Sequence, residues 1–189
     1  MKKEKDASFY NKNWRDHKYA KRQYPSNPQK SLYFPLWDYI LNLINSKERI
    51  VDFGCGGGCL IKLAFQRKLN VMMGVDFSKE AIKRAKNINP EHSDIFIVGD
   101  LYDKKIYDKV KFDTAILSEV LEHLENDLGI LTYFQKNTHI IISIPKYDSP
   151  AHVRYFKNGR GVIHRYEDLI NIKSIKSVRS FFVVDSYKK

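Results

Sequence analysis

The 189-residue sequence has only two cysteines, Cys55 and Cys59, and no run of eighteen apolar residues. So few cysteines exclude a disulfide-rich scaffold, and two thiols without further ligands make a poor zinc site. A bond between them would distort the glycine-rich turn in which they lie, so we expect both to be reduced in a cytoplasmic protein. The missing apolar run argues against a membrane-spanning helix, and the first residues lack the apolar segment of a secretory signal.

Acidic residues are scarce relative to basic ones, and the resulting net charge of +11 is unevenly distributed. Residues 1–30 contain nine Lys and Arg against three Asp and Glu, and residues 146–189 contain ten against four. Residues 31–145 are close to neutral, with fourteen against fifteen. Basic flanks around a neutral middle fit an anionic partner, such as a phosphorylated or nucleotide-linked sugar or RNA. They fit ordinary solvated lysines equally well, so charge alone does not choose a partner.

Glycine is also sparse, yet four of the nine glycines fall within the five residues 54–58. The apolar segment 49–53 precedes them, and a helix is expected from Cys59 to about Lys68. Glycine permits positive φ angles and removes the Cβ atoms that would keep a ligand away from the backbone. A strand, a glycine turn and a helix N-terminus in this order indicate a nucleotide-type binding site.

The rest of the chain alternates short apolar runs with helical patterns, which predicts a parallel sheet covered on both faces. The expected parallel strands are 49–53, 71–75, 95–98, 112–117 and 139–144. The expected helices are 36–44, 59–68, 79–87, 120–134 and 167–170. After Pro145 little chain remains, so we expect a compressed terminal hairpin of two short strands, 171–175 and 181–185. The length suits a single α/β domain over residues 31–189.

Residues 1–30 show no reliable helical or strand period and are predicted to form an arm or lid. Aromatic residues alternate there with basic ones; they include Tyr10, Trp14, His17, Tyr19 and Tyr24. Such a pattern can stack on the ring of a substrate, and it also occurs in arms that simply pack on a domain.

Carboxylates follow the ends of several predicted strands, at Asp52, Asp76, Asp100 and Glu119. Ligands of open parallel sheets bind beyond the carboxyl ends of the strands, so these side chains should face one pocket. Asp76 follows Gly54 at the distance where a carboxylate can hold the hydroxyls of a ribose. That much negative charge suits a ligand with a positive centre better than it suits a pyrophosphate.

In these features the sequence resembles the class I S-adenosylmethionine-dependent methyltransferases, from about Ile50 to Pro145. Val51–Gly58 is similar to the first motif of that family, Gly74–Ser78 to the second, Gly99–Leu101 to the third and Phe112–Leu124 to the fourth. The resemblance implies a Rossmann-like fold with a mostly parallel seven-stranded sheet, and S-adenosylmethionine as cofactor. The implied cofactor-binding residues are Asp52, Gly54, Cys55, Gly56, Gly58, Asp76, Phe77, Ser78, Asp100, Leu101, Ser118 and Glu119.

A hydroxyl acceptor benefits from a base, and His123, Glu122 and His152 are the candidate catalytic residues. Glu119, Glu122 and His123 are spaced i, i+3 and i+4, so a helix beginning here would present them on one face. The loop after Pro145 resembles the segment that lies over the acceptor pocket in many small bacterial methyltransferases. His152 and Arg154 from this loop, together with His164 and Tyr24, are the candidate substrate contacts.

The favoured interpretation is an O-methyltransferase acting on a small, possibly anionic molecule, without a metal. An RNA 2′-O-methyltransferase is the alternative, because Glu119, Glu122 and His123 resemble the metal site of small-RNA 3′-terminal methyltransferases, completed by His152 or His164. A third interpretation is a non-catalytic accessory subunit that binds S-adenosylmethionine.

Overall fold

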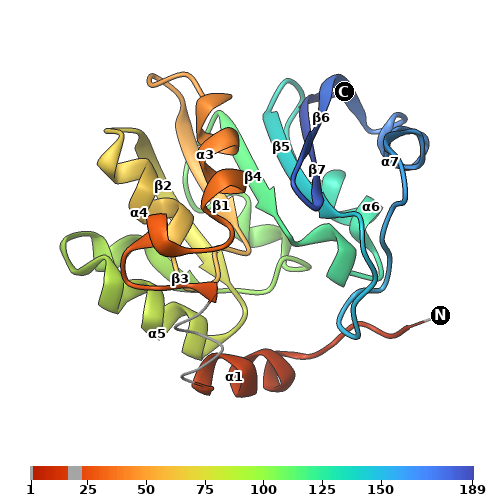
Figure 1. Cartoon of the computed structure of the whole chain (residues 1–189). Coiled ribbons are helices and arrows are strands. Elements are labelled where there is room, and N and C mark those ends of the chain that lie inside the picture. Colours follow the sequence, from red (N-terminus) through yellow and green to blue (C-terminus); the bar gives the residue numbers. More distant parts are fainter. Residues whose placement is uncertain (1, 17–22) are drawn as a thin grey trace.

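The computed structural model describes residues 2–16 and 23–189. Its centre is a seven-stranded sheet in the order β3-β2-β1-β4-β5-β7-β6 (Figure 1). The first five strands pair in parallel, and β7 runs antiparallel to β5 and β6. This confirms the predicted fold class. The strands are β1 (Arg49–Phe53), β2 (Asn70–Asp76), β3 (Phe96–Val98), β4 (Thr114–Ser118), β5 (His139–Pro145), β6 (Ile170–Val178) and β7 (Phe181–Lys188).

Helices cover both faces of this sheet (Figure 1). One face packs against α3, α4 and α5, and the other against α6 and α7. The central strands are therefore buried on both sides, which explains why they read as continuous apolar runs. The α-helices are α1 (Ala7–Arg15), α3 (Phe34–Asn42), α4 (Cys59–Gln66), α5 (Lys79–Ile88), α6 (Asp127–Leu131) and α7 (Gly159–Tyr166). The 3₁₀ helices are η1 (Pro28–Lys30), η2 (Pro90–Ile95), η3 (Lys104–Ile106) and η4 (Leu121–His123).

The single long helix expected at 120–134 is wrong. Glu119 adopts a left-handed conformation with φ of 58°, and η4 follows it. The chain is extended at Leu124, and Asn126 then caps α6 by accepting a hydrogen bond from the Gly129 N–H. The segment thus turns twice below the end of β4, and the idea that Glu119, Glu122 and His123 share one helical face is wrong with it.

The C-terminal hairpin is not compressed, contrary to expectation. β6 pairs with β7 from Ile170 opposite Lys188 to Val178 opposite Phe181. An irregularity between Ile172 and Ser174 breaks the alternation of this exposed edge strand, which hid its length in the sequence. The short helix expected at 167–170 is also wrong, because α7 begins earlier, where the Asn158 side chain accepts from the Gly161 N–H.

The N-terminal arm contains a helix that the sequence pattern did not indicate. Asp6 caps α1 by accepting a hydrogen bond from the Phe9 N–H, as an N-cap aspartate typically does. Figure 1 shows α1 at the edge of the molecule, next to α5. His17 and Tyr19 lie outside the described residues. Within the described ranges, none of the helices combines the length and apolar character that crossing a membrane requires.

Candidate active site

A cavity of about 510 Å³ lies beyond the carboxyl ends of the parallel strands. Ten of the twelve predicted cofactor residues line it, and the two that do not are Gly58 and Ser78. Gly58 instead holds a left-handed turn with φ of 74°, and the Ser78 side chain caps α5 by accepting from the Ala81 N–H. The rule that ligands bind beyond the carboxyl ends of parallel strands therefore located the cavity. Gly58 and Ser78 support the segments that form its wall without lining it.

The glycine turn approaches the cavity with its backbone exposed to it. Gly54 has a φ of 83°, and a Cβ atom there would lie 2.4 Å from the Val120 side chain. The N–H groups of Gly54 and Cys55 both donate to the Val75 carbonyl, which ties the turn to the end of β2. Only glycine satisfies both the backbone angle and the close approach at position 54. Cys55 and Cys59 are buried, free thiols in the described chain, and burial raises the pKa of both.

Asp76 joins the turn to the end of β2. Its Oδ2 accepts from the Gly56 N–H at 3.0 Å, and its Oδ1 accepts from the Ser78 N–H at 2.9 Å. Burial nevertheless raises the Asp76 pKa to about 6. The two N–H groups hold the side chain in place. Each carboxylate oxygen keeps a second lone pair, so it can still accept a hydrogen bond from a ligand hydroxyl.

Asp52 is an uncompensated buried acid in the same wall. It is only 2% exposed, and among the described residues its Oδ1 has no hydrogen-bond donor. Burial, and then the proximity of Asp76, raise its pKa to about 8. A buried acceptor without a donor is costly, so this atom marks a place where a donor or a positive charge on a ligand would stabilise the site.

Two further carboxyl groups follow β4, of which Glu119 lines the cavity and Glu122 lies behind it. Glu119 accepts at Oε1 from the Ser143 hydroxyl at 2.9 Å, and its own N–H donates to the Ser143 Oγ. Glu122 is fully buried below it and does not line the cavity. Burial raises the pKa of both groups, and the neighbouring Glu119 raises that of Glu122 further.

His123 and His152 face the cavity from η4 and from the loop after β5, with ring centres 5.0 Å apart. The Nδ1 of His123 donates to the Ala151 carbonyl at 3.0 Å, and the Nδ1 of His152 donates to the Tyr147 carbonyl at 3.3 Å. A carbonyl can only accept, so in both rings Nε2 carries the free lone pair. Burial lowers the pKa of His123 to about 4 and lowers that of His152, so both rings are neutral at physiological pH.

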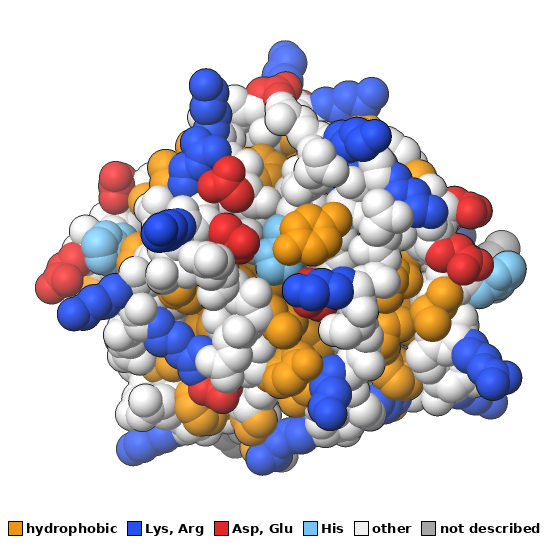
Figure 2. Space-filling model, turned by 90° about the horizontal axis from the view of Figure 1, so that it is seen from above, with side chains coloured by type: hydrophobic (Ala, Val, Ile, Leu, Met, Phe, Trp, Pro, Cys, Tyr) orange, Lys and Arg blue, Asp and Glu red, His pale blue; other side chains and the backbone are white. Residues whose placement is uncertain are grey.

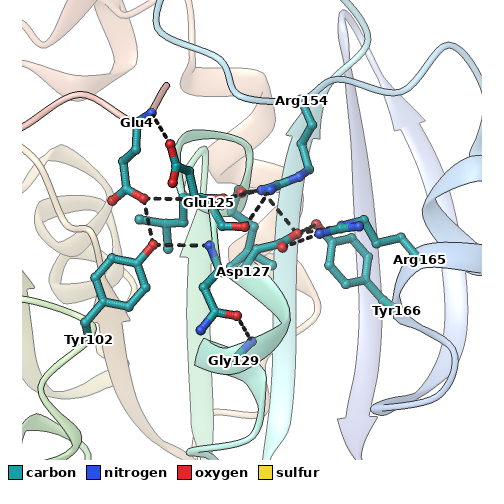
Figure 3. A network of polar contacts seen from close by, with 11 residues as sticks. Glu4, Tyr102, Glu125, Asp127, Gly129, Arg154, Arg165 and Tyr166 are labelled. Carbon is teal, nitrogen blue, oxygen red and sulfur yellow. Dashed lines mark hydrogen bonds and ion pairs between the residues drawn. The ribbon is translucent and has the colours of Figure 1, made fainter. Parts of the chain in front are cut away.

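Arg154 and His164 do not reach the cavity, so the structure does not bring these two predicted substrate contacts to the site. Arg154 donates to backbone carbonyls of Leu121, Leu124 and Glu125 and pairs with the buried Asp127, which also binds Arg165 and Tyr166 (Figure 3). It therefore fixes the segment that carries His123. The His164 side chain is 92% exposed on α7 and pairs with Glu167.

The sequence pattern singled out Tyr10 and Trp14 but missed the helix, α1, that carries both to the cavity wall. The Tyr10 ring lies 5.1 Å from Phe77 and 5.7 Å from His123, and a Cβ atom added at Gly57 would lie 2.9 Å from the Trp14 ring. Tyr24 lines the cavity as predicted, with its ring 4.7 Å from Trp14. Asp6 was the available signal, since an N-cap followed by aromatic residues four apart predicts a helix with one aromatic face.

The strand order, the glycine turn after β1 and the acid at the end of β2 together define a Rossmann-like methyltransferase of class I. A family model described as "Methyltransferase domain" matches residues 19–182, and the chain belongs to this methyltransferase family. Family and fold confirm an enzyme that transfers methyl groups and S-adenosylmethionine as its cofactor.

Solved structures with the same fold cover nearly the whole chain. PH0226 from Pyrococcus horikoshii OT3 is similar with 18% identity and a TM-score of 0.71, over 94% of this chain and 98% of that one. A methyltransferase solved with the Haloferax volcanii Trm112 activator gives 12% identity and a TM-score of 0.75, over 95% and 98%. Magnesium protoporphyrin IX methyltransferase from Synechocystis PCC 6803, solved with SAM, gives 16% and 0.63, over 98% of each chain. A search of curated protein sequences finds no match.

Proposed function

We propose that this methyltransferase transfers the methyl group of S-adenosylmethionine to an oxygen atom of a small molecule, such as a sugar or a phosphorylated or nucleotide-linked metabolite. One observation carries the proposal: the predicted cofactor acids and two neutral histidines with free Nε2 atoms line the same cavity. Acids at one side suit the cationic donor, and neutral imidazoles at the other suit a hydroxyl acceptor.

His123 is the proposed base. The Ala151 carbonyl orients its ring, and the lowered pKa of about 4 leaves Nε2 unprotonated at pH 7. Nε2 also lies 3.7 Å from the Glu122 Oε1, so a carboxyl oxygen is near the proton that Nε2 takes from the acceptor. Most of the rate enhancement would come from aligning the acceptor with the methyl group, with about 7–11 kcal/mol available from positioning.

The size of the cavity favours a small acceptor. Ligand pockets usually measure about 300–1,000 Å³, and this one must hold the cofactor as well as the acceptor within about 510 Å³. RNA could enter only through an extruded nucleotide and would need a basic track on the surface. On the face shown in Figure 2, Lys and Arg side chains are dispersed and interspersed with Asp and Glu.

A methyl-transfer screen tests this proposal. Labelled S-adenosylmethionine is offered with nucleotide-linked sugars, phosphorylated sugars and short RNAs, and we expect label to appear on a hydroxyl oxygen of a small acceptor. With that acceptor, His123→Asn should lower kcat by about 10²–10⁴-fold while cofactor affinity stays near the wild-type value. His164→Asn, on the exposed surface, is the matched control and should leave kcat unchanged.

Label only on RNA would overturn the small-molecule assignment. In that case binding should weaken steeply with salt, with a log–log slope of about −0.7 per phosphate contacted. Cofactor binding without transfer to any acceptor, restored by an added partner protein, would instead favour the accessory-subunit interpretation; one structural neighbour was solved with a methyltransferase activator.

We also propose that the N-terminal arm is the lid of the cavity. Lys2 and Glu4 hold its start, because Lys2 pairs with Asp148 and the Glu4 carboxylate accepts from Tyr102 and Glu125 (Figure 3). Asn11 accepts from the Ser78 hydroxyl, and Arg15 pairs with Glu80. None of the residues of α1 is fully buried, so α1 can detach without disrupting the core.

Replacing Trp14 with alanine should therefore accelerate release of the cofactor product. The lost aromatic packing is worth about 0.5–1.5 kcal/mol, which corresponds to a dissociation rate about two- to tenfold higher. Stopped-flow displacement of S-adenosylhomocysteine measures this rate. Lys12→Ala, an exposed position on the same helix, is the control. Equal rates for Trp14→Ala and wild type would show that the arm does not limit access.

A further inference from the structure

Glu122, His123 and His152 converge at the inner end of the cavity, although they come from two separate segments. One ligand atom from each lies within 4.8 Å of the others, and the His123 Nε2 and Glu122 Oε1 are 3.7 Å apart. Around a tetrahedral metal with bonds of about 2.0–2.2 Å, neighbouring ligand atoms are separated by about 3.4 Å. The three ligand atoms are thus only slightly farther apart than in such a site. Small side-chain rotations would bring them to that separation.

The Glu122 carboxylate supplies an independent sign of a missing cation. The side chain is fully buried, and within the described residues neither of its oxygens has a hydrogen-bond donor. The neighbouring Glu119 carboxyl is the competing partner, because the two groups can satisfy one another only by sharing a proton. Buried carboxylates are normally paired or bound to a metal, so an ion at this position would satisfy the charge.

The backbone around the two histidines is arranged as it is around metal-binding imidazoles. Each Nδ1–H donates to a backbone carbonyl, of Ala151 and of Tyr147, which fixes the ring and leaves one lone pair for a ligand. The Glu122 carbonyl accepts from the N–H groups of Val153 and Arg154, which attaches the loop carrying His152 directly to η4. The three donors are therefore held in register by backbone contacts rather than by chance proximity.

We propose that Glu122, His123 and His152 bind one divalent transition-metal ion, such as Zn²⁺, with an open coordination position toward the cavity. Two imidazoles and one carboxylate form a donor set that suits zinc or iron, and three protein ligands leave room for water or a substrate oxygen. This set keeps Glu122, His123 and His152 of the sequence-based alternative and omits Glu119, which is engaged with Ser143. An ion bound by the His123 Nε2 would occupy the lone pair that the proposed base uses, so metal-free and metal-loaded protein should differ in methyl transfer. Any effect of the ion on activity thus rests on the proposed function, whereas metal binding itself does not.

Titration of the chelator-treated, full-length protein with Co²⁺ and Zn²⁺ tests the site directly. We expect one ion per chain, visible Co²⁺ absorption bands, and shifts of the Nε2 signals of His123 and His152 in imidazole ¹⁵N spectra of the wild-type protein. Loss of an outer-shell partner typically lowers metal affinity by about 10–100-fold. Because Glu122 and His152 are proposed as direct ligands, His152→Ala and Glu122→Gln should each weaken metal binding by at least this much. His164→Ala, which removes an exposed imidazole, should leave affinity unchanged.

The wild-type spectra keep the test decisive even if a buried variant unfolds. Unshifted Nε2 signals at saturating Zn²⁺, or equal affinity of folded His152→Ala and wild type, would overturn the metal site. Glu119 and Glu122 would then be a carboxyl pair that shares a proton. Metal binding without methyl transfer would support the metal site and contradict the proposed function. Methyl transfer without metal binding would support the proposed function and contradict the metal site.

Discussion

Replacing Asp76 with alanine is expected to weaken S-adenosylmethionine binding by at least about 100-fold, because two hydrogen bonds to a carboxylate are worth about 1.5–3 kcal/mol each. Both Asp76 oxygens are already aligned by the N–H groups of Gly56 and Ser78, so the acceptors are preorganised for a pair of ribose hydroxyls. Isothermal titration calorimetry on the folded variant measures the loss. An unchanged dissociation constant would refute the cofactor pose.

Two control variants separate the direct contact from its support of the glycine turn. Asp76→Asn keeps one oxygen and the shape of the side chain, so it should lose less affinity than alanine. Asp108→Ala removes an exposed carboxylate elsewhere and should bind like the wild type. If Asp76→Asn were as defective as Asp76→Ala, the charge rather than the geometry of Asp76 would be responsible.

The cofactor side of the site was predictable because its signals are local. A buried strand must be apolar, a left-handed turn at Gly54 requires glycine, and a carboxylate at a strand end faces the ligand edge of a parallel sheet. Each of these rules connects a residue type to a position without knowledge of the rest of the fold. The positions of the parallel strands along the chain followed from the same apolar runs.

The acceptor side was predicted less well because long-range contacts determine it. His152 and His123 are brought together by backbone bonds between segments about thirty residues apart, which no periodicity reveals. Arg154 was expected to face the substrate, but the buried Asp127 binds its guanidinium instead. The expected helix at 120–134 is likewise broken by tertiary contacts, since the carbonyls of Leu121 and Leu124 accept from Arg154 rather than from the N–H groups of a continuing helix.

The stability of the fold in the absence of cofactor should fall markedly as pH rises. An acid with a raised folded pKa binds more protons in the native state than in the unfolded state, so it destabilises the fold as pH rises. Asp52 and Asp76 have pKa values of about 8 and about 6 in the fold, above an unfolded value of 3.8. The destabilisation that these two carboxyl groups cause is therefore absent below about pH 4 and grows up to about pH 8. The free energy of unfolding falls by at most about 1.4 kcal/mol per pH unit for each carboxyl.

The cofactor should reverse this dependence. S-adenosylmethionine carries positive charge that favours the ionised form of Asp52, so its affinity should rise between about pH 6 and pH 8, by at most about tenfold per unit. Binding should release a proton in this range, which calorimetry in buffers of different ionisation enthalpy detects. In thermal melts, the stabilisation by the cofactor should accordingly be larger at pH 8 than at pH 6.

Asp52→Asn tests which carboxyl is responsible. The amide cannot ionise, so the free variant should lose less stability than the wild type between about pH 6 and pH 8, and its cofactor affinity should vary less with pH. Glu91→Gln, an exposed acid outside the cavity, should retain the wild-type profile. If Asp52→Asn kept the wild-type dependence of cofactor affinity on pH, the positive charge of the cofactor would not act on the Asp52 carboxyl. A flattened profile would place that charge against the end of β1, at the same turn where Gly54 and Gly56 expose the backbone.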